Sequence, residues 1–155
     1  MRRFMSFFSA AAIALLLVGV LATMRDGAAP AAAKESITVI EHATTDAVVD
    51  LGEEGDTVGD TLVFANEVYD ADDASVVGTS TGSCVRTVVG KAWECTWTNS
   101  LADGSIVVQG PFYDDGSDSV LAITGGTGDY AGVTGQMHLK ARDGGAKYEF
   151  TFDIN

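Results

Sequence analysis

The sequence predicts an all-β domain, and three patterns lead to that prediction. First, short segments rich in valine, threonine and aromatic residues recur along residues 37–154, with Gly and Asp clusters between them. Second, apolar and polar residues alternate in the last segment, where Tyr148, Phe150 and Phe152 share one face. Third, this region sustains no apolar repeat of helical period. Short strands with regular turns are typical of a β-sandwich or a β-barrel.

Ten segments of the chain have the character of strands. Closing them into a barrel would remove the exposed edges of the sheet, and this favours a barrel over a sandwich. Turn residues support the division, since Gly52, Gly55 and Gly59 lie in one acidic loop. The expected strands are residues 37–41, 46–50, 61–69, 75–79, 84–88, 93–99, 105–109, 119–124, 135–141 and 147–154.

The first 33 residues have the character of a secretory signal peptide. A short basic start precedes an apolar run over residues 4–23, and small residues at 28–33 offer a cleavage site before Lys34. The alternative is an uncleaved anchor, because the run approaches the roughly 20 residues that span a bilayer. We expect a secreted, extracellular protein in which residues 34–155 form one domain.

The expected mature chain is strongly acidic. The sequence has nine Lys and Arg and 22 Asp and Glu, and residues 1–33 contain three of the basic residues and one acid, so the mature charge is 6 − 21 = −15. Phosphate backbones and anionic lipids would repel such a chain. We therefore expect no nucleic acid partner, and no membrane partner beyond the possible N-terminal anchor.

Cys84 and Cys95 are the two cysteines of the chain. If the segment between them turns as a hairpin at residues 89–90, they lie opposite one another within bridging reach. We therefore expect a disulfide rather than free thiols, and no metal site, since only two distant histidines accompany them. The same hairpin would oppose Arg86 and Trp93 and permit a cation–π contact on the outer face.

The histidines and aromatic residues indicate no familiar catalytic arrangement. His42 lies beside Glu41 in the first expected strand, so the two point to opposite faces and only one can face a barrel interior. Tyr69, Trp97 and Phe112 are expected to line the core or a cavity. No Ser-His-Asp or Cys-His arrangement can be argued from the spacing.

Two stretches of the sequence carry motifs of a known family. Residues 59–85 contain GDTLVF and then GTSTGSCV, and residues 108–136 contain VQGPF and then LAITGGTG. In this order and spacing they resemble the allene oxide cyclases, and the GGTG segment is shared with plant dirigent proteins. The resemblance covers most of residues 59–139.

The resemblance implies an eight-stranded antiparallel barrel with an apolar cavity, packed as a homotrimer and working without metal or cofactor. The cyclases convert an unstable allylic epoxide into a cyclopentenone. Dirigent proteins fix the face on which radical or quinone methide species couple. In both families catalysis is mostly confinement in a pocket that excludes water.

The family's functional residues are only partly retained. Glu41 stands in the place of a first-strand Glu that stabilises developing positive charge, and Cys84 matches a cavity cysteine. Ala43 replaces an Asn, and Phe112 replaces a Tyr. Two polar groups that the epoxide chemistry would use are therefore missing at these positions.

Two functional hypotheses follow. In the first, the barrel binds a small apolar molecule and steers its cyclisation or stereoselective coupling as a cofactor-independent isomerase or cyclase. Glu41 is then the catalytic residue, and Cys84, Phe112, Trp97 and Tyr69 line the cavity. In the second, the barrel is a non-catalytic extracellular carrier or ligand-binding protein. An interior filled by side chains would support neither hypothesis.

Overall fold

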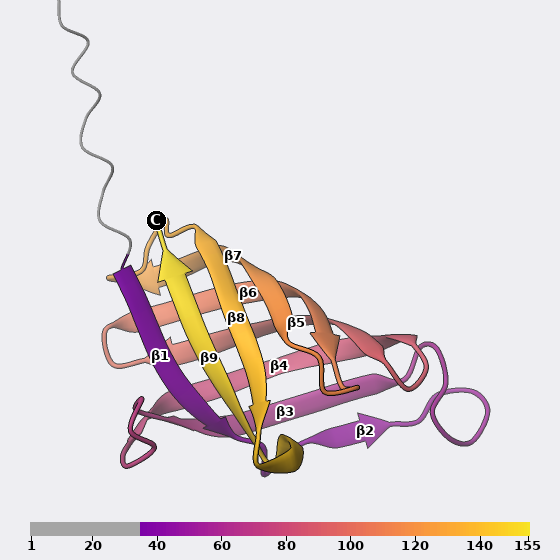
Figure 1. Cartoon of the computed structure of the whole chain (residues 1–155). Coiled ribbons are helices and arrows are strands. Elements are labelled where there is room, and N and C mark those ends of the chain that lie inside the picture. The colour runs from indigo at the N-terminus through magenta and orange to yellow at the C-terminus, as the bar shows by residue number, and fades with distance from the viewer. Residues whose placement is uncertain (1–34) are drawn as a thin grey trace, which may run out of the picture. The chain divides into compact units, whose positions relative to one another are not determined.

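The computed structural model describes residues 35–155, which form an antiparallel β-barrel (Figure 1). The expected signal peptide lies outside the described residues. Within residues 35–155, no helix is long and apolar enough to cross a membrane. The elements are β1 Glu35–His42, β2 Ala47–Val49, β3 Thr61–Tyr69, β4 Val76–Val88, β5 Ala92–Leu101, β6 Gly104–Tyr113, β7 Ser119–Gly128, β8 Gly135–Arg142, the short 3-10 turn η1 Asp143–Gly145 and β9 Lys147–Ile154.

Eight of the nine strands close the barrel. They follow the order β1-β9-β8-β7-β6-β5-β4-β3, and β1 returns to β3 through the pair Glu41 and Val68. In Figure 1, β1, β9 and β8 cross in front of β3 to β6. The additional strand β2 pairs with the beginning of β3, where Ala47 lies opposite Val63. The prediction of an all-β, eight-stranded antiparallel barrel is confirmed, with β2 as an extra strand.

Strand β4 is one continuous strand of 13 residues where the sequence predicted two. The expected segments 75–79 and 84–88 are joined because Gly78 and Gly82 do not interrupt the ladder. An added Cβ at Gly82 would lie 2.2 Å from the Cβ of Trp97, and one at Gly78 would lie 2.1 Å from the carbonyl oxygen of Ser100. These glycines therefore permit the close approach of β5 and do not mark a turn.

The alternating side chains of the strands point into the barrel and leave a small cavity there. The alternation predicted for β9 is confirmed, since Phe150 and Phe152 are buried and Tyr148 on the same face is half-buried. Residues from neighbouring strands complete this core: Val39, Leu62, Val68, Ile106, Val108, Leu121, Ile123, Met137 and Leu139 are all buried. The interior is thus mostly apolar, and the polar groups inside it stand out.

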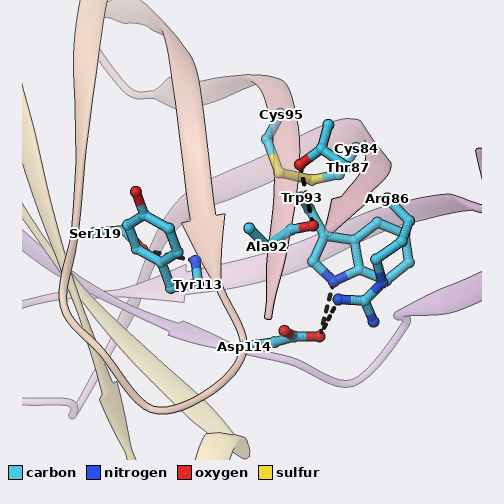
Figure 2. The surroundings of a disulfide bond; sticks show 9 residues. All are labelled: Cys84, Arg86, Thr87, Ala92, Trp93, Cys95, Tyr113, Asp114 and Ser119. Atoms are coloured by element: carbon cyan, nitrogen blue, oxygen red, sulfur yellow. Dashed lines mark hydrogen bonds and ion pairs between the residues drawn. A yellow bond between two sulfur atoms is a disulfide. The ribbon is translucent and has the colours of Figure 1, made fainter. Parts of the chain in front are cut away.

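The β4–β5 hairpin contains the predicted disulfide (Figure 2). Cys84 and Cys95 are direct partners across the two strands, and both are buried. The predicted cation–π contact also forms, with the Arg86 guanidinium 3.8 Å from the Trp93 ring centre. Its expected place on the outer face was wrong, because residues two apart in a strand share a face and both side chains lie buried with the disulfide.

Candidate functional site

A cavity of about 30 Å³ lies inside the barrel. Five aromatic rings form much of its wall, and the acids Glu41 and Asp46 also reach it. A water molecule needs roughly 10–15 Å³ of such space, so the cavity accommodates about two. The lining residues are Glu41, Asp46, Leu62, Phe64, Cys84, Trp97, Phe112, Leu139, Tyr148 and Phe150.

Two of the aromatic rings at the cavity are less deeply buried than Trp97 and Phe150. Phe112 and Tyr148 are only half-buried and pack edge to face, with ring centres 5.5 Å apart. Trp97 and Phe150 are buried and packed against one another. A drug-sized molecule fills some 300 Å³ or more, so it enters only when the half-buried rings move aside.

Four of the predicted site residues line this cavity and one does not. Glu41, Cys84, Trp97 and Phe112 are all part of its wall. Tyr69 was expected beside them, and this is corrected by the structure. Its ring stacks on His42 outside the barrel with ring centres 3.9 Å apart, because the neighbouring Val68 takes the inward position.

Glu41 is a buried acid with an incomplete set of partners. Only 5 % of the residue is exposed, and this burial raises the pKa of its carboxyl from 4.5 to about 7. Ser80 and Asn66 lie near enough to lower this pKa, and the Asp46 carboxylate raises it. Within residues 35–155, the Oε1 atom of Glu41 has no hydrogen-bond partner.

Asn66 holds the second acid of the site, Asp46, at the cavity. Its Oδ1 atom accepts hydrogen bonds from the backbone N–H groups of Thr44 and Thr45, and from the Thr45 hydroxyl. Its Nδ2 atom donates to Oδ1 of Asp46 at 2.7 Å. A single buried amide thereby fixes the loop between β1 and β2 and holds Asp46 at the cavity wall.

The structure supplies polar groups that the sequence comparison expected to be missing. Ala43 and Phe112 stand where the family has an Asn and a Tyr, but Asn66 from β3 and Tyr148 from β9 bring an amide and a phenol to the same region. Burial, and then the nearby Asp46 and Glu41, raise the pKa of the Tyr148 hydroxyl.

Sequence reasoning missed Asp46, Asn66, Ser80 and Tyr148 as parts of the site. One signal for Asn66 was available, because it follows the alternation of Phe64 in β3 and so occupies an inward position as a polar residue. Asp46 lies in a loop, and no periodic pattern indicates where a loop residue points.

The arrangement can bind and polarise a molecule placed against the aromatic rings. A carboxyl group with a pKa near 7 exists in both protonation states at neutral pH, so it can give or take a proton. When ionised, it would stabilise positive charge strongly, because the apolar surroundings screen little.

The fold and the site define a class of protein: a small closed β-barrel with a buried acid in an aromatic-lined cavity. The chain belongs to the allene oxide cyclase family, which it matches over residues 32–155. The family resemblance noted in the sequence, including that to dirigent proteins, is thereby confirmed.

Solved structures support this assignment. A pyocyanin demethylase superposes with a TM-score of 0.70 at 25% sequence identity, and the match covers 78% of this chain and 100% of that one. A pterocarpan synthase dirigent protein has a TM-score of 0.64 at 14% identity, covering 86% and 98%. An exo-specific intermolecular Diels–Alderase has a TM-score of 0.62 at 16% identity, covering 78% and 97%. The last two show likeness of fold alone.

Proposed function

We propose that this chain is an exported barrel that binds a small apolar molecule and steers its cyclisation or stereoselective coupling. The observation that carries the proposal is Glu41, an acid with a pKa of about 7 in a cavity lined by aromatic rings. In the proposed reaction, ionised Glu41 stabilises positive charge that develops on the bound molecule. The reaction is an isomerisation or a coupling, and the protein supplies orientation and charge.

Confinement supports this role. A molecule held among Trp97, Phe150 and Phe112 has few orientations open to it. Holding reacting groups in one geometry contributes several kcal/mol, roughly 7–11 in the best intramolecular reactions. The structural neighbours include a Diels–Alderase, a dirigent protein and a cyclase described as catalysing a [4 + 2] cycloaddition.

The test is a measurement of product chirality. Purified protein is incubated with an unsaturated epoxide, a phenol that couples through its radical, and a diene tethered to an alkene. We expect one product in enantiomeric excess by chiral chromatography. Glu41→Gln, the isosteric control, is expected to lower the rate by at least about 100-fold. Racemic products from every precursor, at the uncatalysed rate, would refute the proposal.

A second candidate is demethylation of a flat aromatic molecule. It is favoured by one observation, the higher identity to the pyocyanin demethylase, which is matched over its full length. In a balanced reaction, water supplies the oxygen with which the methyl carbon leaves as formaldehyde, and the electron pair released reduces the aromatic ring. Incubation with pyocyanin tests this candidate through the appearance of formaldehyde and of the demethylated ring in mass spectrometry. A molecule that binds tightly but is recovered unchanged from all these assays would instead indicate a non-catalytic carrier.

Export and trimer formation are further parts of the proposal. Export rests on the signal-like pattern of residues 1–33, and N-terminal sequencing of protein from the culture medium is expected to begin at Lys34. The homotrimer rests on the family resemblance. Light scattering at micromolar concentration tests it, and a monomer mass would remove it.

A further inference from the structure

A row of three polar side chains crosses the barrel interior, and Glu41 links it to the cavity, which none of the three lines. Asn66 of β3, Ser80 of β4 and Asn99 of β5 are direct partners on neighbouring strands. All three point inward, and none is more than 1% exposed. Ser80 and Asn66 also lie against the carboxyl of Glu41, which connects the row to the cavity.

The side chain at one end of the row, Asn66, has hydrogen-bond partners, and the side chain at the other end, Asn99, has none among the described residues. Asn66 has its partners in the loop between β1 and β2. The Ser80 hydroxyl lies against the Glu41 carboxyl and has no other partner within residues 35–155. Across the described part of the chain, the two polar atoms of the Asn99 side chain do not have a hydrogen-bond partner. Neither does the indole nitrogen of Trp97, two residues before Asn99 on the same face of β5.

Buried polar atoms without hydrogen-bond partners are unusual in folded proteins. Each unpaired buried polar group costs about 1–3 kcal/mol, and more than nine in ten find a partner in folded proteins. The barrel does not need polarity at this level, since Ile106 of β6 follows Asn99 in the same row and is apolar and buried. The unpaired atoms are therefore available to a bound molecule.

The chemistry of these atoms defines what they would recognise. Ser80 and Asn99 can each both donate and accept, Trp97 can only donate, and Glu41 accepts when ionised and donates when protonated. A phenolic hydroxyl or a ring carbonyl fits this set, because its oxygen accepts from the donors and a hydroxyl also donates to an acceptor. The aromatic wall beside the row fits the ring to which that oxygen is attached.

We propose that Ser80 and Asn99, together with Glu41, bind the hydroxyl or carbonyl oxygen of a small, flat aromatic molecule whose ring occupies the cavity. This inference rests on the proposed function and names the ligand class. The polar oxygen lies deep in the barrel, and the ring lies between it and the movable side chains of Phe112 and Tyr148.

The experiment compares two probes of the same shape, 2-naphthol and 2-methylnaphthalene, by isothermal titration calorimetry on the full chain. We expect the native protein to bind 2-naphthol at least about tenfold more tightly, because only the hydroxyl can pair with the row. In Asn99→Leu and in Ser80→Ala, this preference is expected to fall below about threefold, while the affinity for 2-methylnaphthalene stays the same. Thr98→Val, which changes the neighbouring residue on the opposite face, is the matched control and should leave both affinities unchanged.

A stability measurement separates ligand binding from a structural role. If the unpaired atoms serve a ligand, Asn99→Leu removes a buried cost, and the melting temperature without ligand stays the same or rises. A lower melting temperature in both variants with an unchanged preference for 2-naphthol would mean that the row holds structural water, and this overturns the inference.

The remaining outcomes distinguish this inference from the proposed function. Equal affinity of the native protein for both probes would refute the polar site while leaving an apolar binding cavity intact. No binding of either probe up to its solubility limit would refute both.

Discussion

Two buried acids, Asp60 and Glu41, show how the barrel treats charge in two different regions. Asp60 precedes β3 and is 1% exposed, and its carboxylate accepts hydrogen bonds from the backbone N–H groups of Leu51 and Thr57 and from the Thr57 hydroxyl. The backbone bonds, first from Thr57 and then from Leu51, hold its pKa below its usual range. Glu41 is buried almost as deeply, but its pKa is raised. At Asp60 the hydrogen bonds outweigh desolvation, whereas at Glu41 desolvation outweighs the hydrogen bonds from Ser80 and Asn66.

Polar groups at the end of the barrel and polar groups in its interior also differ in whether they have partners. At the end, Arg86 pairs with Asp114 at 2.7 Å, and the Trp93 indole also donates to Asp114 (Figure 2). Arg86 pairs with Asp56 as well, at 2.6 Å. In the interior, Asn99 has no partner within residues 35–155. The paired end stabilises the fold, and the unpaired interior is where a ligand would gain binding energy.

Replacing Arg86 is expected to have the largest effect on the free energy of unfolding. Arg86→Met leaves two carboxylates without their partner and removes the cation–π contact, and we expect a loss of about 4 kcal/mol in the free energy of unfolding. Urea denaturation measures it. Arg142→Met is the matched control, because Arg142 pairs with Glu149 at the surface and should cost about 0.5 kcal/mol or less. A loss below about 1 kcal/mol for Arg86→Met would show that the paired end is not structural.

The stability of Glu41→Gln, compared with that of the native protein at several pH values, tests the raised pKa of Glu41. The pKa of Glu41 is raised on folding, so the folded state holds the proton more tightly, and stability is lost as the pH rises from 4.5 to about 7. Glutamine removes this loss. The variant is expected to be more stable than the native protein by roughly 3 kcal/mol at pH 8, with no such gain at pH 4. Equal stability of the two proteins at pH 8 would contradict the raised pKa.

The disulfide gives a third test, because it fixes the strands that carry Trp97 and Ser80. Replacing both Cys84 and Cys95 by Ala opens a loop with a sequence separation of 11. The chain-entropy relation gives a loss of about 3 kcal/mol for a loop of this size. Thermal unfolding of the double variant and of the reduced native protein should give similar losses. No loss in either would mean that the hairpin needs no cross-link.

The smallest effect is expected on the outer face of β1. His42 lies 2.6 Å from Asp73 and stacks on Tyr69, and all of these are partly exposed. His42→Ala should cost about 1 kcal/mol, measured by urea denaturation. His138→Ala, with a longer contact of 3.4 Å to Asp153, should cost less. A reversed order would show that the stack on Tyr69 contributes nothing.

Much of the fold could be predicted because its signals are local. Alternation in β9 and the order of the family motifs indicate a barrel, and the hairpin register places Cys84 opposite Cys95. The continuity of β4 could not be predicted, because a glycine reads equally as a turn and as a close approach to a neighbouring strand. Gly82 is the second of these, and only its packing on Trp97 shows it.

The site was harder to predict from the sequence, because its residues are far apart along the chain and meet only in the folded barrel. Glu41 could be chosen from one strand and one motif. Asp46 is held at the cavity wall by a hydrogen bond from Asn66, which lies in a strand about 20 residues away. Tyr69 was misplaced although the information was present, since its neighbour Val68 is the apolar residue in phase with the inward face of β3.

The barrel interior holds an acid, Glu41, whose burial raises its pKa more than its hydrogen-bond partners lower it. The most direct measurement is a pH titration of the side-chain carboxyl carbon of Glu41 by ¹³C NMR, with Glu41→Gln used to assign the resonance. A midpoint of about 7 is predicted. A midpoint at the ordinary value of 4.5 would contradict the account.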